Sequence, residues 1–287
     1  MFADLFAEIV RTRVHRPQAI VEAAAARRRG RIGGRLVLVA ADHPARGALR
    51  AGARPLAMAD RADLLERLCV ALSRPGVDGV LGTADVLEDL LLLGALEDKV
   101  VFGSMNRGGL AGTVFEIDDR FTGYTADAVA AMGFDGGKML LRVDPDDPTT
   151  VSTLESCAHA VDALAARQRI AMVEPFLSHR VDGKVRNELT ADAMIRAIAV
   201  ASGLGGTSAY TWLKVPVVPE MERVMATSTL PALLLGGEVT GDPDAAFEGW
   251  REALKLPTVK GIVAGRSLLY PSDDDVGGAV DTAVSLL

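Results

Sequence analysis

Short apolar runs alternate with helical patterns along the chain, and this alternation limits the folds that the sequence can adopt. The runs are rich in Val, Leu and Ile and carry few polar residues, which is typical of strands buried on both faces of a parallel sheet. We predict strands at residues 36–41, 79–82, 100–103, 138–143, 170–174, 210–218, 232–235 and 261–264. Eight strands with helical segments between them, in 287 residues, favour an α/β fold of the (β/α)8 TIM-barrel type.

An open, doubly wound sheet is the alternative fold. No G-x-G-x-x-G motif follows an early strand, which weakens that alternative. Because no low-complexity linker divides the chain, we predict a single domain over residues 1–287, with an N-terminal helical extension over residues 1–34. An apolar stripe in this extension, which includes Phe6 and Val10, is expected to pack on the domain or on a second subunit. A homo-oligomer is therefore expected.

Charge and cysteine content exclude several classes of protein. A net charge of −7 argues against nucleic-acid binding and against attraction to anionic membranes. Cys69 and Cys157 form no paired motif, and Asp4 and Glu8 interrupt the apolar residues where a signal peptide would lie, so we expect a cytoplasmic protein. The histidines lack metal-ligand spacing, so neither a metal nor another cofactor is expected.

Lys214 is the most informative single residue, because it lies within the apolar strand predicted at residues 210–218. Burial of an ammonium group is costly and disfavours its charged form. A buried lysine with a lowered pKa is what an amine nucleophile requires. Lys214 is therefore either a Schiff-base lysine or a lysine at a strand end whose ammonium group reaches water.

Alternation of side chains along the strands brings further polar residues toward Lys214. The register that places Lys214, Lys138 and Asp42 inside the barrel leaves the more apolar residues facing the helices. Glu174 ends the strand between the two lysines and can balance their charge and transfer protons. The alternative is an internal ion-pair network without chemistry, which we disfavour because buried ion pairs stabilise proteins poorly.

The ends of the seventh and eighth predicted strands suit a phosphate group. Gly236 and Gly237 allow close approach of the backbone to a ligand, and Gly265 precedes Arg266, whose guanidinium can bind phosphate in a bidentate manner. These residues are predicted to bind the substrate phosphate.

Arg142 ends the fourth predicted strand and has two possible roles. It either pairs with Asp144 or Asp146 or holds a second anionic group of the substrate, such as a carboxylate. His43, beside Asp42, is interpreted as a residue that contacts the catalytic residues and does not itself contact the substrate.

The chain resembles the class I, Schiff-base aldolases of the group that contains tagatose-bisphosphate aldolase and deoxyribose-phosphate aldolase. The resemblance extends from Asp42 to Arg266 and is carried by residues 137–144, 173–175, 213–215, 235–237 and 264–266. It implies a lyase of carbohydrate metabolism in which Lys214 forms the Schiff base. It also implies a supporting role for Lys138, acid–base catalysis by Glu174, assistance of C–C cleavage by Asp42, and phosphate binding by Gly236, Gly237, Gly265 and Arg266.

Two departures bear on the substrate that the resemblance implies. Deoxyribose-phosphate aldolases carry a second lysine on the seventh strand, which this chain lacks, so the tagatose-bisphosphate-like pattern is closer. Those enzymes tend to have a tyrosine near the position of Arg142, and the arginine here suits the phosphate ester of a sugar acid. The chain also resembles an aldolase-like group linked to inositol catabolism in high-GC bacteria. The substrate implied there is a 5-dehydro-2-deoxygluconate phosphate, which is cleaved to dihydroxyacetone phosphate and malonate semialdehyde.

Other functions remain open on the same scaffold. The alternatives are an acyl or ketol transferase, a non-catalytic barrel that binds sugar phosphates, and a metal-dependent aldolase. The expected partner is a small phosphorylated sugar or sugar acid, and neither nucleic acid nor a membrane is expected as a partner.

Overall fold

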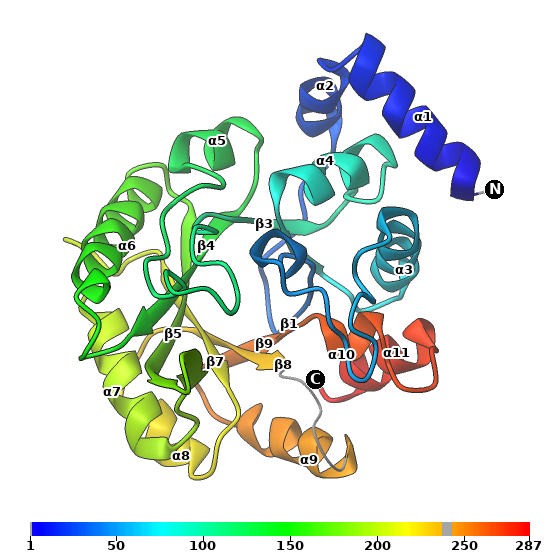
Figure 1. Cartoon of the computed structure of the whole chain (residues 1–287). Coiled ribbons are helices and arrows are strands. Elements are labelled where there is room, and N and C mark those ends of the chain that lie inside the picture. The colour runs from blue at the N-terminus through cyan, green and yellow to red at the C-terminus, as the bar shows by residue number, and fades with distance from the viewer. Residues whose placement is uncertain (1, 237–242) are drawn as a thin grey trace.

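Parallel strands form a closed barrel in the computed structural model, which describes residues 2–236 and 243–287 (Figure 1). Around the barrel each strand pairs with the next one along the chain, and the last strand pairs with the first. The barrel strands are β1 (Leu36–Ala40), β2 (Gly79–Gly82), β3 (Val100–Ser104), β4 (Gly136–Val143), β5 (Ile170–Val181), β7 (Thr211–Pro216), β8 (Ala232–Gly236) and β9 (Val259–Ala264). The predicted (β/α)8 barrel is confirmed.

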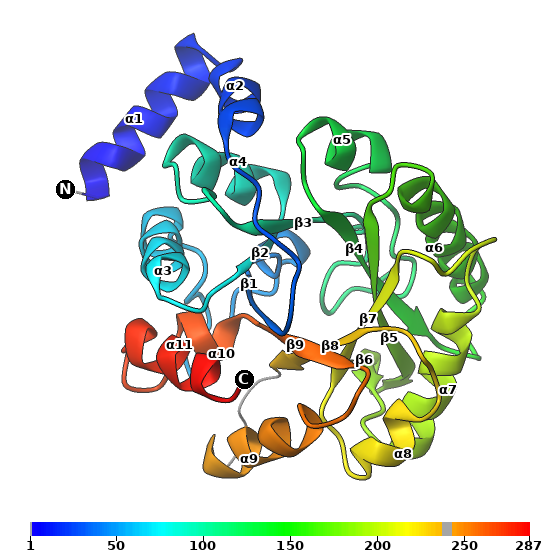
Figure 2. The same ribbon diagram turned by 180° about the vertical axis from the view of Figure 1, so that it is seen from behind.

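Helices surround the barrel on its outside (Figures 1 and 2). Those that follow the strands are η1 (Pro44–Arg46), α3 (Arg61–Ser73), α4 (Ala84–Leu92), α5 (Ala126–Ala131), α6 (Thr149–Ala165), α7 (Ala191–Ser202), α8 (Met221–Met225), α9 (Pro243–Ala253), α10 (Arg266–Leu269) and α11 (Val276–Ser285). Several begin at a side chain that accepts hydrogen bonds from the first free amide groups, which fixes where the helix starts. These capping residues are Asp60, Thr125, Thr190 and Asp275.

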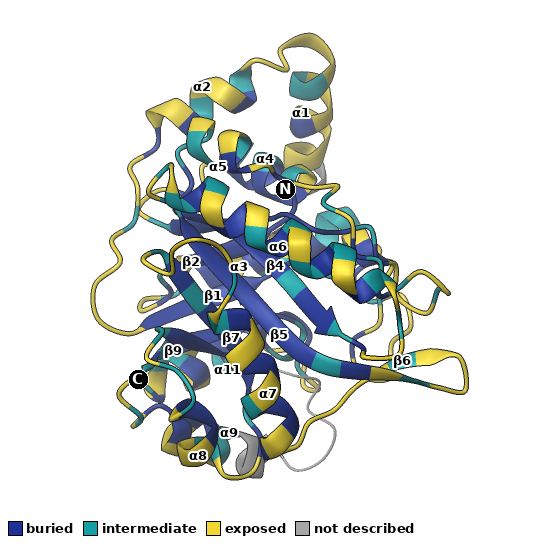
Figure 3. Cartoon of the chain, turned by 90° about the vertical axis from the view of Figure 1, so that its left-hand side faces the viewer, coloured by how far each residue is buried: buried dark blue, intermediate teal, exposed yellow. Residues whose placement is uncertain are grey.

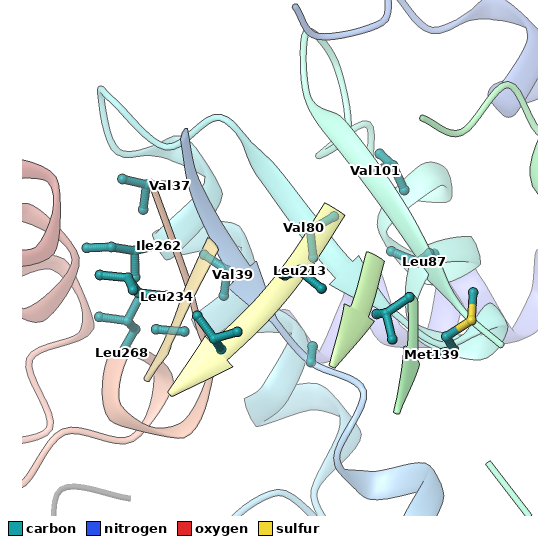
Figure 4. Close-up of a cluster of buried hydrophobic side chains, with 14 of the residues drawn as sticks. Val37, Val39, Val80, Leu87, Val101, Met139, Leu213, Leu234, Ile262 and Leu268 are labelled. Carbon is teal, nitrogen blue, oxygen red and sulfur yellow. The ribbon is translucent and has the colours of Figure 1, made fainter. Parts of the chain in front are cut away.

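Apolar side chains fill both faces of the barrel wall. On β7, Leu213 and Val215 face outward into the large core between strands and helices, and Figure 4 shows Leu213 within that core. Trp212 faces inward and packs against a smaller cluster that contains Leu38, Phe102 and other residues. The alternation predicted for this strand is confirmed, and it turns Lys214 toward the barrel interior.

A hairpin extends β5 well beyond the strand predicted at residues 170–174. β5 continues to Val181 and pairs in antiparallel fashion with β6 (Lys184–Asn187). Asp182 and Gly183 connect the two strands with positive φ angles of 50° and 74°, which is the conformation of a type I′ hairpin turn. The hairpin projects beyond the barrel and carries exposed residues at its tip (Figure 3), and it brings Asn187 to the mouth of the barrel.

Two N-terminal helices, α1 (Phe2–His15) and α2 (Ala19–Ala26), lie outside the ring of helices (Figures 1 and 2). Arg13 joins α1 to α4 through ion pairs of 3.0 Å with Glu88 and 2.8 Å with Asp89. Ile9 is buried, whereas Phe6 and other apolar residues of α1 are exposed. Of the helices that the structure describes, none is long and apolar enough to cross a membrane.

Candidate active site

A cavity of about 680 Å³ lies at the carboxyl ends of the barrel strands, which is where barrel enzymes place their catalytic residues. Strand ends and the loops that follow them form its wall. The predicted residues that line it are Asp42, Lys138, Glu174, Lys214, Gly236, Gly265 and Arg266. Gly237, which is also predicted to bind phosphate, lies outside the described residues.

Glu174 joins the two lysines at the base of this cavity. The Lys214 Nζ atom donates to Glu174 Oε1 at 2.8 Å, and the Lys138 Nζ atom lies 2.5 Å from Glu174 Oε2. Lys138 and Lys214 are only 3% and 4% exposed, so bulk water does not reach either ammonium group freely. Burial raises the pKa of Glu174, but the two ammonium groups outweigh it and lower this pKa to about 2.

Asp42 follows β1 and occupies a second polar position beside Lys138. Its carboxylate accepts hydrogen bonds from Ser104 Oγ at 3.1 Å and from Lys138 Nζ at 3.4 Å, and it lies 2.5 Å from the Arg107 guanidinium. Burial opposes the charge on Asp42, but Arg107 and Lys138 outweigh burial and hold the pKa well below its usual range. Asp42 is therefore a carboxylate at neutral pH.

The charges in this cluster do not balance when every group is ionised. Three cations, Lys138, Lys214 and Arg107, face the two carboxylates of Asp42 and Glu174. Burial lowers the pKa of Lys138, although Asp42 and Glu174 act in the opposite direction. Loss of one lysine proton would neutralise the cluster, so its electrostatics favour the presence of one neutral amine.

His43 lines the cavity next to Asp42. Burial lowers its pKa to about 3, and although Asp42 raises it, the nearby Arg266, Lys214 and Arg107 lower it further. The imidazole is therefore neutral at physiological pH. Its Nδ1 atom lies 3.9 Å from Asp42 Oδ1, too far for a direct hydrogen bond.

Glycines at the ends of β8 and β9 line one corner of the cavity, where the barrel wall is packed too closely for a larger residue. A Cβ atom at Gly265 would lie 2.5 Å from the carbonyl oxygen of Ala40, and one at Gly236 would lie 3.1 Å from the Trp250 ring. Arg266 begins α10 immediately after this corner, and the first amides of a helix have no partner within the helix. The corner thus combines a guanidinium with closely approaching backbone.

Arg142 is placed differently from its prediction as a substrate ligand. Its Nη1 atom lies 2.5 Å from Glu116 Oε1, and its Nη2 atom donates to the Glu116 carbonyl oxygen at 2.9 Å. Arg142 does not line the cavity, and its predicted pairing with Asp144 or Asp146 is wrong. Glu116 belongs to the long segment between β3 and α5, so Arg142 fixes this segment over the end of β4.

Three polar residues that line the cavity escaped the sequence analysis: Arg46, Arg107 and Asn187. Arg107 comes three residues after Ser104, the last residue of β3. The rule used for the other strands, which looks for polar residues just after a strand, would have found it. Asn187 lies on the unpredicted β6, where its side-chain oxygen accepts from Ser178 Oγ at 2.9 Å.

Among residues 2–236 and 243–287, no group of three or more His, Cys, Asp or Glu side chains is placed to hold a metal ion. The polar groups of the cavity are dominated instead by amines and guanidinium groups. These groups suit carbonyl chemistry and the binding of anions.

Comparison with known proteins identifies the family. The Cgl0159-like family pattern matches residues 34–284. The chain belongs to the Cgl0159-like family. The crystal structure of Cgl0159 from Corynebacterium glutamicum (Brevibacterium flavum) is 53% identical, with a TM-score of 0.96, over 99% of this chain and 96% of that chain. No curated protein sequence matches the chain.

More distant members of the fold include aldolases. A Schiff-base-forming fructose-1,6-bisphosphate aldolase is 18% identical with a TM-score of 0.64, over 93% of this chain and 99% of that chain. An archaeal fructose 1,6-bisphosphate aldolase is 17% identical with a TM-score of 0.65, over 93% and 98% of the two chains. At these identities the likeness shows a common barrel fold, and the chemistry must be argued from the site itself.

Proposed function

We propose that the protein is a Schiff-base aldolase that cleaves a phosphorylated ketose or keto-sugar acid. The observation that carries this proposal is the contact of Glu174 with both Lys214 and Lys138 inside the cavity. A nucleophilic amine, an acid–base carboxylate and a second amine are the groups that formation and breakdown of an imine require. In this proposal Lys214 is the nucleophile, as the resemblance to class I aldolases implies.

Proton transfer between the lysines and Glu174 drives formation of the imine. The neutral amine of Lys214 attacks the substrate ketone, and Glu174 accepts a proton from the Nζ atom 2.8 Å away. Lys138 donates a proton to the former carbonyl oxygen. Glu174 then returns its proton as the hydroxyl group leaves as water. The neighbouring ammonium groups lower the pKa of Glu174, so the carboxyl group returns its proton readily.

The iminium then accepts the electron pair released when the carbon–carbon bond breaks. Asp42 takes the proton of the hydroxyl group that becomes the aldehyde oxygen. Lys138 has by then given up its proton, which removes one of the charges that lower the pKa of Asp42. The enamine that remains takes on carbon the proton held by Asp42, which gives an iminium again. Water then hydrolyses this iminium, which releases the second product and restores the Lys214 amine, and the proton set free returns to Lys138.

The corner formed by Gly236, Gly265 and Arg266 is the proposed phosphate site, with Gly237 as a further ligand. In this proposal Arg266 supplies the positive charge, and Gly236 and Gly265, which line the cavity beside it, carry no side chain that would occupy the space of the phosphate. The substrate suggested by the resemblance is a 5-dehydro-2-deoxygluconate phosphate of inositol catabolism. Fructose 1,6-bisphosphate, which appears in the names of the structural neighbours, is a second substrate to test.

Imine trapping tests the proposal directly. The protein is incubated with each candidate substrate and sodium borohydride, and the modified peptide is located by mass spectrometry. We expect one adduct on Lys214 and no adduct in Lys214→Ala. Lys260→Ala is the control, because Lys260 lies at the amino end of β9 and donates to the Pro257 carbonyl oxygen, at the end of the barrel opposite the strand carboxyl ends. An adduct that persists in Lys214→Ala would overturn the assignment.

A further inference from the structure

His43 lines the cavity, and the proposed aldol steps do not use it. Its Nδ1 atom is buried and makes no hydrogen bond within residues 2–236 and 243–287. The side chain as a whole is 25% exposed, so the exposed part of the ring is the opposite edge, which carries Nε2. Arg46 and Arg107 also have a buried nitrogen without a partner, but their other nitrogens donate hydrogen bonds. His43 makes no hydrogen bond at either nitrogen to the described part of the chain.

The charges around His43 determine which group it presents to the cavity. Its imidazole is neutral because burial lowers its pKa to about 3, which the carboxylate of Asp42 does not offset. The other charged groups that act on the ring are all cations: Arg266, Lys214 and Arg107. A neutral imidazole has one N–H donor and one acceptor nitrogen. Because Nδ1 faces Asp42 Oδ1 at 3.9 Å, the proton is favoured on Nδ1, and Nε2 is the acceptor.

An acceptor nitrogen at the cavity edge selects among the groups of a substrate. A phosphate dianion and a ketone oxygen are themselves acceptors, so neither forms a hydrogen bond with the Nε2 atom of a neutral imidazole. A hydroxyl group donates its O–H and satisfies this nitrogen. His43 is therefore suited to bind a substrate hydroxyl group.

His43 lies between two parts of the proposed site. It follows Asp42 directly in the chain, and a Cβ atom at Gly265 would lie 3.0 Å from its Cε1 atom. In the proposed function Asp42 takes the proton of the hydroxyl group that becomes the aldehyde oxygen, whereas the phosphate lies beside Gly265 and Arg266. The part of the substrate between these groups is the ketone, which reacts with Lys214, and the next carbon, at which the bond breaks. A hydroxyl group on that carbon is the donor that this segment can offer.

We propose that His43 accepts a hydrogen bond from a hydroxyl group on the carbon next to the ketone, on its side away from the phosphate. The substrates are then phosphorylated ketones whose phosphate-bearing half is a dihydroxyacetone phosphate unit, and analogues with hydrogen in place of this hydroxyl group are bound less tightly. This assignment rests on the proposed function for the positions of the phosphate and the ketone. It gives His43 direct contact with the substrate, in contrast to the interpretation made from the sequence.

A matched pair of ligands tests the assignment without requiring any reaction. sn-Glycerol 3-phosphate carries a hydroxyl group on the corresponding carbon, propane-1,2-diol 1-phosphate of the same configuration carries hydrogen there, and neither has a ketone. We expect isothermal titration calorimetry to show that the protein binds glycerol 3-phosphate about 3- to 10-fold more tightly, the range of a hydrogen bond between neutral groups. His43→Phe should abolish this preference, because phenylalanine has a ring but no acceptor, and leave the affinity for the propanediol phosphate unchanged.

Further variants separate a hydrogen bond from a structural role. His43→Gln should retain part of the preference, because its amide oxygen is an acceptor near the position of Nε2. His43→Leu is a second apolar substitution, which replaces His43→Phe in the comparison if circular dichroism shows that the phenylalanine variant is unfolded. His179→Phe is the control, because His179 is exposed on β5 and does not line the cavity, so the preference should persist in it.

The possible outcomes distinguish this proposal from the proposed function. Equal affinities for the two ligands in the unaltered protein would overturn the role of His43, as would a preference that survives in the apolar variants. Either result leaves the phosphate site and the Schiff base intact. If neither ligand binds, the phosphate site is wrong, and the assignment of His43 fails with it. Because neither ligand forms an imine, failure of borohydride trapping does not affect this test.

Discussion

Glu174→Gln tests whether the charge of the carboxylate between the two lysines stabilises the folded protein. The pKa of Glu174 is lowered from 4.5 to about 2, which corresponds to about 3 kcal/mol of stability at neutral pH. A carboxyl group with a lowered pKa stabilises the folded state above its unfolded pKa. That stabilisation is lost as the pH falls from about 4.5 toward 2. Glutamine carries no charge, so the variant lacks this contribution at every pH.

The expected result is a difference in the free energy of unfolding that depends on pH. Urea unfolding followed by circular dichroism should give a deficit of about 3 kcal/mol for Glu174→Gln at pH 7 and about half of that at pH 3. Glu155→Gln is the control, because Glu155 is exposed on α6 and its substitution should change stability by less than about 0.5 kcal/mol. A deficit that stays constant between pH 7 and pH 3 would refute the reasoning.

Substitution of two arginines should distinguish a role in substrate binding from a role in the stability of the fold. Arg266→Ala should raise KM for a phosphorylated substrate and change kcat little, since its charge meets the phosphate; steady-state kinetics that show an unchanged KM would contradict the phosphate site. Arg142→Met should lower the free energy of unfolding by about 3–5 kcal/mol, since it leaves the Glu116 carboxylate without its partner. A large rise in KM at preserved stability would instead return Arg142 to the substrate site.

Strand periodicity was sufficient to predict the barrel and the direction of its inward residues. Lys214 could be placed inside because Leu213 and Val215 are apolar on both sides of it, and the structure buries both in the outer core. The same reasoning brought Asp42, Lys138 and Glu174 to one cavity, where their contacts are observed. Burial of apolar side chains determines this part of the structure, and the sequence records it directly.

The β5–β6 hairpin carried a recognisable signal that we did not use. Asp182-Gly183 is a favoured pair for a two-residue hairpin turn. Pro175 follows the predicted strand, and proline is uncommon inside strands. In the structure β5 passes through Pro175 and continues to Val181, and the hairpin places Asn187 at the cavity.

Partners in the long segment after β3 could not be predicted in the same way. Pairing with the nearby Asp144 or Asp146 was one of two roles considered for Arg142, but its partner is Glu116, 26 residues earlier in the chain. Arg107 approaches Asp42 across 65 residues. Neither pairing follows from periodicity, because an irregular segment has no repeat from which the direction of its side chains can be read.

The seam between β1 and β9 has a consequence for synthesis of the chain. Gly265 packs against the carbonyl oxygen of Ala40, next to Asp42, so the first and last strands form one wall of the cavity. During translation, β1 must wait until β9 has been synthesised before its last neighbour arrives. A ligand that needs both Asp42 and Arg266 therefore cannot stabilise a growing chain before β9 and Arg266 have been synthesised.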